Sequence, residues 1–353
     1  TSGSGHVGPT WSLRGLGRAI LREPRSYHGD LHPACRTMRP DSDPTPEFPP
    51  ISMAALDAWR ASGRFAQAAG HRVFARIDDR HRDTRPWLLL IHGFPTASFD
   101  WHPLWAHLAQ DFNLLAPDLL GFGDSDKPRR HDYRISGQAD LIEHWCGQLG
   151  IERMHVLAHD YGVTVAQELL ARDQERSTSG RSTRIQSVVF LNGGLFPEAH
   201  RPRLIQKLLL TPLGPLLSRL LTKPVFARSF RAIFGPKTRP SADEIDAFWA
   251  LIAARDGQRI AHRLMRYVRE RQRQRERWVG ALTGTTIPMR LVNGALDPVS
   301  GAHLVARYRE LIREADVVWL DDIGHYPQVE APERVHASLR NFWGRIGAIS
   351  PAG

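Results

Sequence analysis

The stretch Arg-Met-His-Val-Leu-Ala-His-Asp-Tyr-Gly-Val-Thr-Val-Ala-Gln-Glu-Leu-Leu, residues 153–170, decides the fold. It begins with an apolar run typical of a buried strand and continues with the spacing of a helix. Between the two, Ala158 and Gly162 stand two residues before and after Asp160. Small residues at these places let strand and helix pass closely while the central side chain stands exposed in a strained turn. The pattern predicts a strand–turn–helix unit that presents the Asp160 carboxylate as a nucleophile.

The aspartate at the centre of this turn determines the type of chemistry. A carboxylate attacks a saturated carbon, as in an epoxide or an alkyl halide, and forms an alkyl-enzyme ester. A serine at the same place would attack an acyl carbon instead. We therefore expect a hydrolase that passes through a covalent ester on Asp160, which water then hydrolyses.

An apolar run and a short loop upstream supply the groups that such a nucleophile needs. Trp87-Leu-Leu-Leu-Ile91 is typical of a central parallel strand buried on both faces, and His92-Gly-Phe-Pro95 follows it. A loop at this place offers a backbone N–H to an oxyanion, here that of Phe94. The second N–H is expected from Tyr161, directly after the nucleophile.

Two apolar runs downstream each end in a candidate partner for Asp160. Residues 287–293 precede Asp297, and residues 315–320 precede His325. Open α/β sheets place their sites beyond the carboxyl ends of the strands. The sequence thus predicts a triad in which Asp297 orients His325, and neutral His325 activates the water that hydrolyses the ester.

The rest of the pattern alternates between strands and helices, which predicts a mostly parallel sheet. Strands are expected near 65–69, 71–78, 87–91, 113–117, 153–158, 186–192, 287–293 and 315–320. Helices are expected near 102–110, 136–149, 162–173, 301–313 and 331–345, with an exposed polar loop at 173–183. The alternation stops after residue 194, where prolines divide a helical pattern into short segments up to about residue 283.

Together these motifs resemble the α/β-hydrolase superfamily, in the branch of epoxide hydrolases and haloalkane dehalogenases, and most of all the mesoderm-specific transcript-like hydrolases. The similarity implies an α/β-hydrolase fold, in which helices flank an eight-stranded, mostly parallel sheet. It further implies a core of residues 51–194 and 284–349 and an all-helical cap of residues 195–283. It also places His92 and Trp101, with Phe94 and Tyr161, in the oxyanion and substrate-binding group. The matching segments are 92–101, 118–128, 159–170, 192–202, 277–282 and 325–328.

The resemblance leaves several activities open. Tyr267 matches the cap tyrosine with which epoxide hydrolases donate a proton to the opening ring, but the second tyrosine of such pairs is missing. Its region holds Phe226, Phe230 and Phe234. Haloalkane dehalogenases hold the halide with a tryptophan where this chain has Tyr161, and the side chain of Phe94 offers no donor. Epoxide hydrolysis on a hydrophobic small molecule is therefore favoured over dehalogenation or ester hydrolysis. The non-enzyme alternative is a catalytically weak scaffold at membranes.

The helical segment carries the positive charge of the chain. Residues 195–283 hold 18 Lys and Arg against 7 Asp and Glu, whereas the whole chain has a net charge of +10. The arginine-rich stretch 266–277 is expected to be a solvated helix face and not a nucleic-acid site, because no aromatic stacking platform accompanies it. The leucines of 208–221 are expected to line the substrate tunnel, with contact to an anionic membrane as the alternative.

Composition bounds the remaining possibilities. No apolar run approaches the ~20 residues that span a bilayer, and we expect a cytoplasmic protein that is at most peripheral to a membrane. Cys35 and Cys146 are expected to be free thiols in a reducing compartment, and no Cys and His cluster indicates a metal or cofactor. Residues 1–50 are expected to be disordered or loosely packed, with Met38 as a candidate start.

Overall fold

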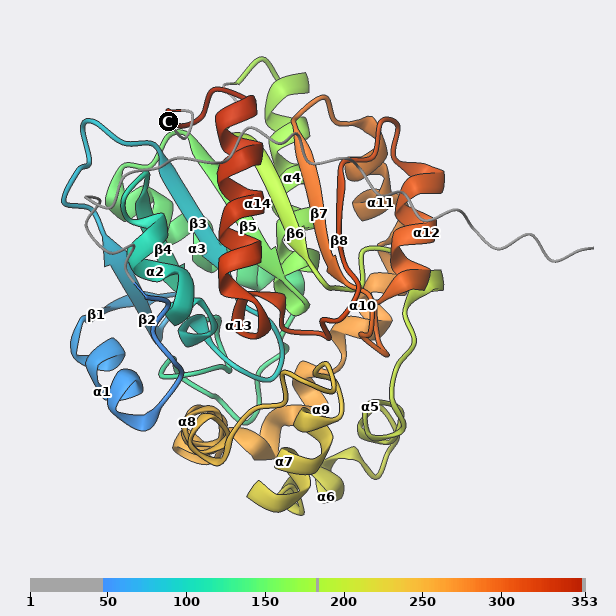
Figure 1. Cartoon of the computed structure of the whole chain (residues 1–353). Coiled ribbons are helices and arrows are strands. Elements are labelled where there is room, and N and C mark those ends of the chain that lie inside the picture. Colours follow the sequence, from blue (N-terminus) through green and yellow to red (C-terminus); the bar gives the residue numbers. More distant parts are fainter. Residues whose placement is uncertain (1–46, 182–183, 351–353) are drawn as a thin grey trace, which may run out of the picture. The chain divides into compact units, whose positions relative to one another are not determined.

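The computed structural model describes residues 47–181 and 184–350 of the chain, and its centre is one sheet of eight strands (Figure 1). The strand order is β1-β2-β4-β3-β5-β6-β7-β8. The pairs β1–β2 and β2–β4 are antiparallel, and all other neighbouring pairs are parallel. This is the predicted sheet. The strands are β1 Gly63–Ala68, β2 His71–Asp78, β3 Trp87–Ile91, β4 Asn113–Pro117, β5 Met154–His159, β6 Ile185–Leu191, β7 Met289–Gly294 and β8 Val317–Leu320.

Helices cover both faces of the sheet, and alternate residues of its central strands feed two separate cores. Leu89 and Val156 pack in a cluster with α3, α4 and α12, while Leu88 and Leu90 pack in a second cluster with α1, α2 and α14. Figure 1 shows α14 crossing one face, with α3 and α4 on the other. These helices are α1 Met53–Ala61, α2 His102–Leu108, α3 Ile135–Leu149, α4 Tyr161–Thr178, α12 Ala302–Leu311 and α14 Pro332–Arg345. A short helix, α13 Pro327–Glu330, precedes α14.

A purely helical segment connects β6 to β7, and we call residues 195–283 the helical insertion. Pro215 and Pro224 stand in the first turns of α6 and α7, where a missing N–H costs nothing, so the prolines start helices as well as separate them. Figure 1 shows α5 to α9 gathered at one end of the sheet. The helices are α5 Leu204–Leu209, α6 Gly214–Arg219, α7 Lys223–Arg231, α8 Ala242–Ala253, α9 Ala261–Leu264, α10 Tyr267–Arg273 and α11 Arg275–Gly284. The bounds of a separate cap stay a prediction.

The prediction of an exposed loop at 173–183 is wrong for its first half, because α4 continues to Thr178. Tertiary contacts hold this extension. The buried Asp173 carboxylate accepts hydrogen bonds from the N–H groups of Arg184 and Ile185, and Arg277 of α11 pairs with Glu175. Arg184 and Ile185 lie beyond the end of the helix and Arg277 lies 102 positions from Glu175, so the local polar composition pointed to a loop where the fold builds a helix.

Some expectations fall mostly outside the described residues. Residues 1–46, with Cys35 and Met38, are among those not described. Of the next few, Phe48 stacks on His107 with ring centroids 3.8 Å apart. Cys146 is a buried free thiol on α3. Among the described helices, none is long and apolar enough to cross a membrane.

Candidate active site

The turn between β5 and α4 forces its central residue into a strained backbone conformation. Asp160 has φ 44° and ψ −105°, a region that a residue with a Cβ rarely adopts. The N–H of Asp160 donates to the carbonyl of Asn192 at 2.8 Å, which ties the turn to the end of β6. A Cβ on Gly162 would stand 2.4 Å from the carbonyl oxygen of Ile91, so only glycine lets α4 start this close to β3. The predicted sharp turn is therefore present at residues 158–162.

Within the described residues, one oxygen of the Asp160 carboxylate accepts a hydrogen bond and the other accepts none. Its Oδ2 accepts a hydrogen bond from the Phe94 N–H at 3.0 Å, while Oδ1 lies 3.7 Å from Nε2 of His325. Tyr161 is the first residue of α4, and an N–H in a first helical turn has no acceptor within its helix. Burial raises the pKa of Asp160, and the charge of His325, the Phe94 N–H and the charge of Arg271 oppose that rise.

Asp297 and His325 come together as the triad prediction requires. The Nδ1–H of His325 donates to Oδ2 of Asp297 at 2.7 Å, which leaves Nε2 facing Asp160. Burial favours the neutral imidazole, but the two nearby carboxylates outweigh it and raise the pKa of His325 to about 9. The pKa of Asp297 falls well below its usual range, because the influence of His325 and the hydrogen bonds to its carboxylate exceed the effect of burial.

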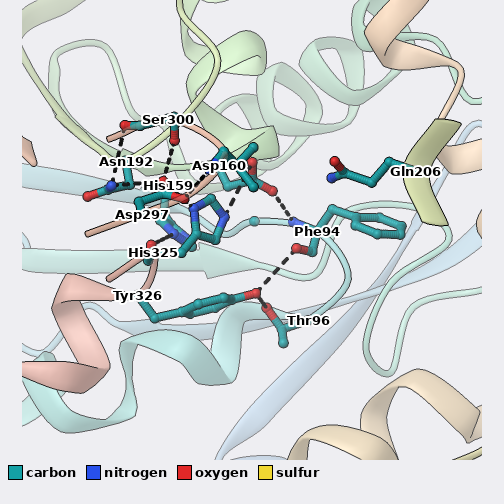
Figure 2. A network of polar contacts seen from close by, with 12 residues as sticks. Phe94, Thr96, His159, Asp160, Asn192, Gln206, Asp297, Ser300, His325 and Tyr326 are labelled. Atoms are coloured by element: carbon teal, nitrogen blue, oxygen red, sulfur yellow. Dashed lines mark hydrogen bonds and ion pairs between the residues drawn. The ribbon is translucent and has the colours of Figure 1, made fainter. Parts of the chain in front are cut away.

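Residues that the sequence analysis did not place in the site hold Asp297 in position (Figure 2). Asn192 Nδ2 and Ser300 Oγ donate to its Oδ2 at 2.9 and 2.6 Å, and the Val299 N–H donates to Oδ1 at 2.7 Å. Asn192 follows β6 directly, so its place at the carboxyl end of a parallel strand was an available signal. No local pattern marked Ser300.

A second missed group supports the loop after β3. His159, directly before Asp160, donates from Nε2 to the backbone carbonyl of His325 at 2.8 Å, and burial keeps its pKa well below the usual value. Tyr326 donates its hydroxyl to the Phe94 carbonyl at 3.2 Å and also contacts Thr96 (Figure 2). Tyr326 therefore holds the backbone that carries the Phe94 N–H, and His159 ties the turn at Asp160 to the loop after β8.

His92 and Trp101 are buried but do not line the cavity that contains Asp160. His92 Nε2 accepts from the Leu119 N–H at 3.0 Å and its Nδ1 donates to the Gly93 carbonyl at 2.8 Å. Burial lowers the pKa of His92 to about 4, so it is neutral and ties the loop to the end of β4. Trp101 ends the short 3-10 helix η1 (Ser98–Trp101) and packs in the core.

A cavity of about 120 Å³ lies in front of Asp160, and its lining is mainly apolar. Asp160, His325 and Phe94 meet it from the core, and α5, α6 and α7 close it from the helical insertion. The predicted leucine lining is present in part, through Leu209, Leu217 and Leu221. The phenylalanines of the insertion line it through Phe226 and Phe230. Polar groups facing this cavity include Lys127, Arg203, Gln206, Ser229 and Gln258.

Tyr267 lies beside the nucleophile turn but is not among the residues that line this cavity. It is 1% exposed, and its ring packs on that of Tyr161 with centroids 4.8 Å apart. Burial and the negative charge of Asp160 raise the pKa of Tyr267, so its phenol stays protonated. Gln206 of α5 does line the cavity, and Figure 2 shows it across from Asp160.

The arginine-rich stretch 266–277 is not a uniformly solvated face, as the sequence analysis expected. Arg271 is 2% exposed, donates from Nε and Nη2 to Thr164 Oγ1, and lies 4.8 Å from the ring centre of Tyr267. No carboxylate within the described part of the chain forms an ion pair with it, and its Nη1 has no hydrogen-bond partner there. Arg277 pairs with Glu168 at 2.8 Å. The stretch therefore joins the insertion to α4 and brings one buried cation next to the site.

The architecture and the triad geometry together define a protein of the α/β-hydrolase class. The family model described as alpha/beta hydrolase fold matches residues 86–332. The chain belongs to the α/β-hydrolase superfamily.

Curated relatives extend over most of the chain. It is 44% identical over 291 residues to the mesoderm-specific transcript homolog protein of Homo sapiens, which covers 80% of this chain and 86% of the relative. It is 42% identical over 284 residues to the hydrolase LipZ of Mycobacterium tuberculosis strain H37Rv, covering 80% and 96%.

Solved structures with the same fold include members of both enzyme groups named above. The haloalkane dehalogenase DbeA from Bradyrhizobium elkani is 24% identical with a TM-score of 0.67, covering 81% of this chain and 99% of that one. The epoxide hydrolase CorEH is 18% identical with a TM-score of 0.64, covering 80% and 99%. At this identity the likeness establishes the fold alone.

Proposed function

We propose that this hydrolase opens an epoxide on a hydrophobic small molecule through a covalent ester on Asp160. The observation that carries the proposal is the position of the Asp160 carboxylate, which lines an apolar cavity with Oδ1 free and Oδ2 bonded to the Phe94 N–H. A carboxylate so placed is a nucleophile for saturated carbon.

In the first step, Oδ1 of Asp160 attacks a ring carbon, and the carbon–oxygen bond of the epoxide breaks. The released alkoxide takes a proton from an acid, and we assign this role to Tyr267, whose ring packs on Tyr161 and whose phenol stays protonated. Since Tyr267 does not line the cavity, the transfer requires a bridging water or a movement of its side chain. The product is a hydroxyalkyl ester whose carbonyl oxygen, Oδ2, already has the Phe94 N–H as a donor.

In the second step, His325 removes a proton from water, and the resulting hydroxide attacks Cγ of Asp160. The tetrahedral oxyanion on Oδ2 accepts hydrogen bonds from the N–H groups of Phe94 and Tyr161. Collapse breaks the Cγ–Oδ1 bond, and the leaving alkoxide takes the proton of the new carboxylic acid, which gives the diol and returns the carboxylate. Asp297 stabilises the imidazolium during this step, and the imidazolium proton then returns through solvent to the Tyr267 phenolate. Water and epoxide thus give a diol with no other reactant.

Dehalogenation is less well supported by the same cavity. In haloalkane dehalogenases the residue at the Phe94 position donates to the departing halide, and the side chain of Phe94 has no donor. Ester hydrolysis would need attack on an acyl carbon, which serine favours over aspartate.

A single turnover in ¹⁸O-labelled water tests the proposal. With enzyme in excess over a styrene-type epoxide, we expect the new oxygen of the diol to be ¹⁶O from Asp160, and the label to appear in the peptide that contains Asp160. Label in the diol after one turnover would mean that water attacks the substrate directly, and the ester mechanism would be wrong. A panel of alkyl halides and activated esters under the same conditions identifies the substrate class.

A further inference from the structure

Leucines project into solvent from the outer side of α5 and α6. Leu204, Leu213, Leu216 and Leu220 are between 56% and 72% exposed, and Leu208 is 36% exposed. α5 and α6 contact each other, and we call these five exposed leucines together the leucine surface. Single exposed leucines are ordinary, whereas a group of them marks an interaction site.

The opposite side of the same two helices faces the substrate cavity. Ile205 and Leu209 of α5, Leu217 of α6 and Leu221 beyond it line that cavity. One layer of short helices therefore separates the leucine surface from the space in front of Asp160. The exposed leucines and the cavity lining therefore belong to the same two short helices.

The segment that carries the leucine surface is basic throughout. Between Glu198 and Asp243 the sequence has nine Lys and Arg and no Asp or Glu. Lys207 and Arg219 are exposed on α5 and α6 themselves. Within the described part of this segment, the ion pair of Lys223 with Asp246 is the only one. Its positive charge is thus mostly left for an outside partner.

We propose that the leucine surface docks on an anionic lipid bilayer and that the substrate reaches Asp160 from the lipid phase. Leucines in the interfacial layer with Lys and Arg among the headgroups are the arrangement that binds such membranes. A second copy of this chain fits poorly, because the two basic surfaces would repel each other. The docking stands on the surface alone, whereas the lipid-phase substrate rests on the proposed function.

Vesicle flotation of the full chain tests the docking. We expect binding to phosphatidylcholine vesicles that contain phosphatidylglycerol and weak binding to phosphatidylcholine alone. Replacing Leu213, Leu216 and Leu220 together by serine should reduce binding at least ~10-fold, and so should Lys207→Gln with Arg219→Gln, since each basic residue contributes to attraction by anionic lipid. High salt should weaken the wild type.

The matched controls are exposed residues that lie outside the helical insertion. Trp319→Ser removes an exposed apolar side chain on β8, and Arg309→Gln with Arg313→Gln removes two exposed basic residues on or beside α12. We expect both to bind vesicles like the wild type. The docking would be overturned if these controls lost binding equally or if the wild type did not bind vesicles. It would also be overturned if analytical ultracentrifugation showed a wild-type dimer that is absent in the leucine variant.

Turnover separates the docking from the substrate route. The leucine variant should lose activity on a long-chain alkyl epoxide carried in anionic vesicles and keep its activity on a short, water-soluble epoxide. Equal activity of wild type and variant on the vesicle-borne epoxide would overturn the lipid-phase route. If neither epoxide is turned over by the wild type, the proposed function fails, and flotation still decides the docking.

Discussion

Nε2 of His325 lies 3.7 Å from Oδ1 of Asp160. This separation is longer than a hydrogen bond, so Oδ1 keeps its lone pairs available for attack while Oδ2 is bonded to the Phe94 N–H. In the proposed mechanism the same imidazole then serves the second step, because it lies beside the ester that Oδ1 has formed. One histidine can thus act on the ester without competing with the nucleophile.

Asp160→Asn should abolish turnover while the protein stays folded. The change is isosteric, but an amide is a far weaker nucleophile than a carboxylate, and we expect a loss of at least ~10³-fold. Initial rates measure the loss, thermal unfolding checks the fold, and intact mass detects slow deamidation back to aspartate. Asp243→Asn on the surface is the control. Normal turnover by the unreverted variant would show that another group attacks the substrate.

His325→Gln should stop the reaction at the ester. Attack by Asp160 needs no base, whereas hydrolysis of the ester does. After incubation with an epoxide, intact mass should rise by one substrate unit, located by peptide mapping at Asp160. An alkyl halide would add its alkyl group instead. A variant that binds substrate but keeps its original mass would contradict the two-step scheme.

The second step should depend on pH through His325. The carboxylates of Asp297 and Asp160 outweigh burial and raise the pKa of His325 to about 9 in the resting protein. Ester formation removes the charge of Asp160, so the pKa of His325 in the alkyl-enzyme lies below that value. Since the base must be neutral, decay of the ester should slow in acid and reach a plateau above the lower pKa. Stopped-flow single turnovers measure this decay. A decay rate that does not change with pH would contradict the role of His325 as the base.

Arg271 should keep Asp160 ionised. Burial raises the pKa of Asp160 and the charge of Arg271 lowers it, so Arg271→Gln should raise it further. Because only the carboxylate attacks, the acid limb of the kcat/KM profile should move to higher pH. Arg271→Lys keeps the charge and should move the limb less. If Arg271→Gln lowers the stability of the protein but leaves the acid limb of the kcat/KM profile unchanged, Arg271 only packs against Thr164.

The sequence predicted those parts of the fold and site that carry a local signal. Fully apolar runs located the buried strands, and the small residues around Asp160 located the turn. Asp297 and His325 followed from their place just after strands, because parallel strands bring their carboxyl ends to one edge. These inferences need only neighbouring residues and a topology rule.

What the sequence did not predict depends on partners far along the chain. Arg271 belongs to a stretch with the composition of a solvated helix, yet it is buried against Thr164, 107 positions away. Asn192 reaches Asp297 across 105 positions. The division of the leucines between cavity and solvent depends on how α5 and α6 are oriented, and helices of six residues show too little periodicity to reveal it.

The role of Tyr267 separates epoxide opening from the other activities. A phenol that protonates the alkoxide acts only when oxygen leaves as part of a strained ether. General acid catalysis contributes typically ~10²–10⁴-fold, so Tyr267→Phe should lower epoxide turnover at least ~10-fold even with partial rescue by water. Ester or halide turnover, measured on the same variant, should stay nearly unchanged.

Gln206 is the matched comparison, because its amide lines the cavity in front of Asp160 but has no proton to give at neutral pH. Gln206→Leu should therefore raise KM for an epoxide more than it lowers kcat. If Gln206→Leu lowers kcat strongly and Tyr267→Phe does not, the amide of Gln206, and not the phenol of Tyr267, stabilises the alkoxide. If Tyr267→Phe slows every substrate equally, the tyrosine only packs on Tyr161, and the ring oxygen must take its proton from elsewhere.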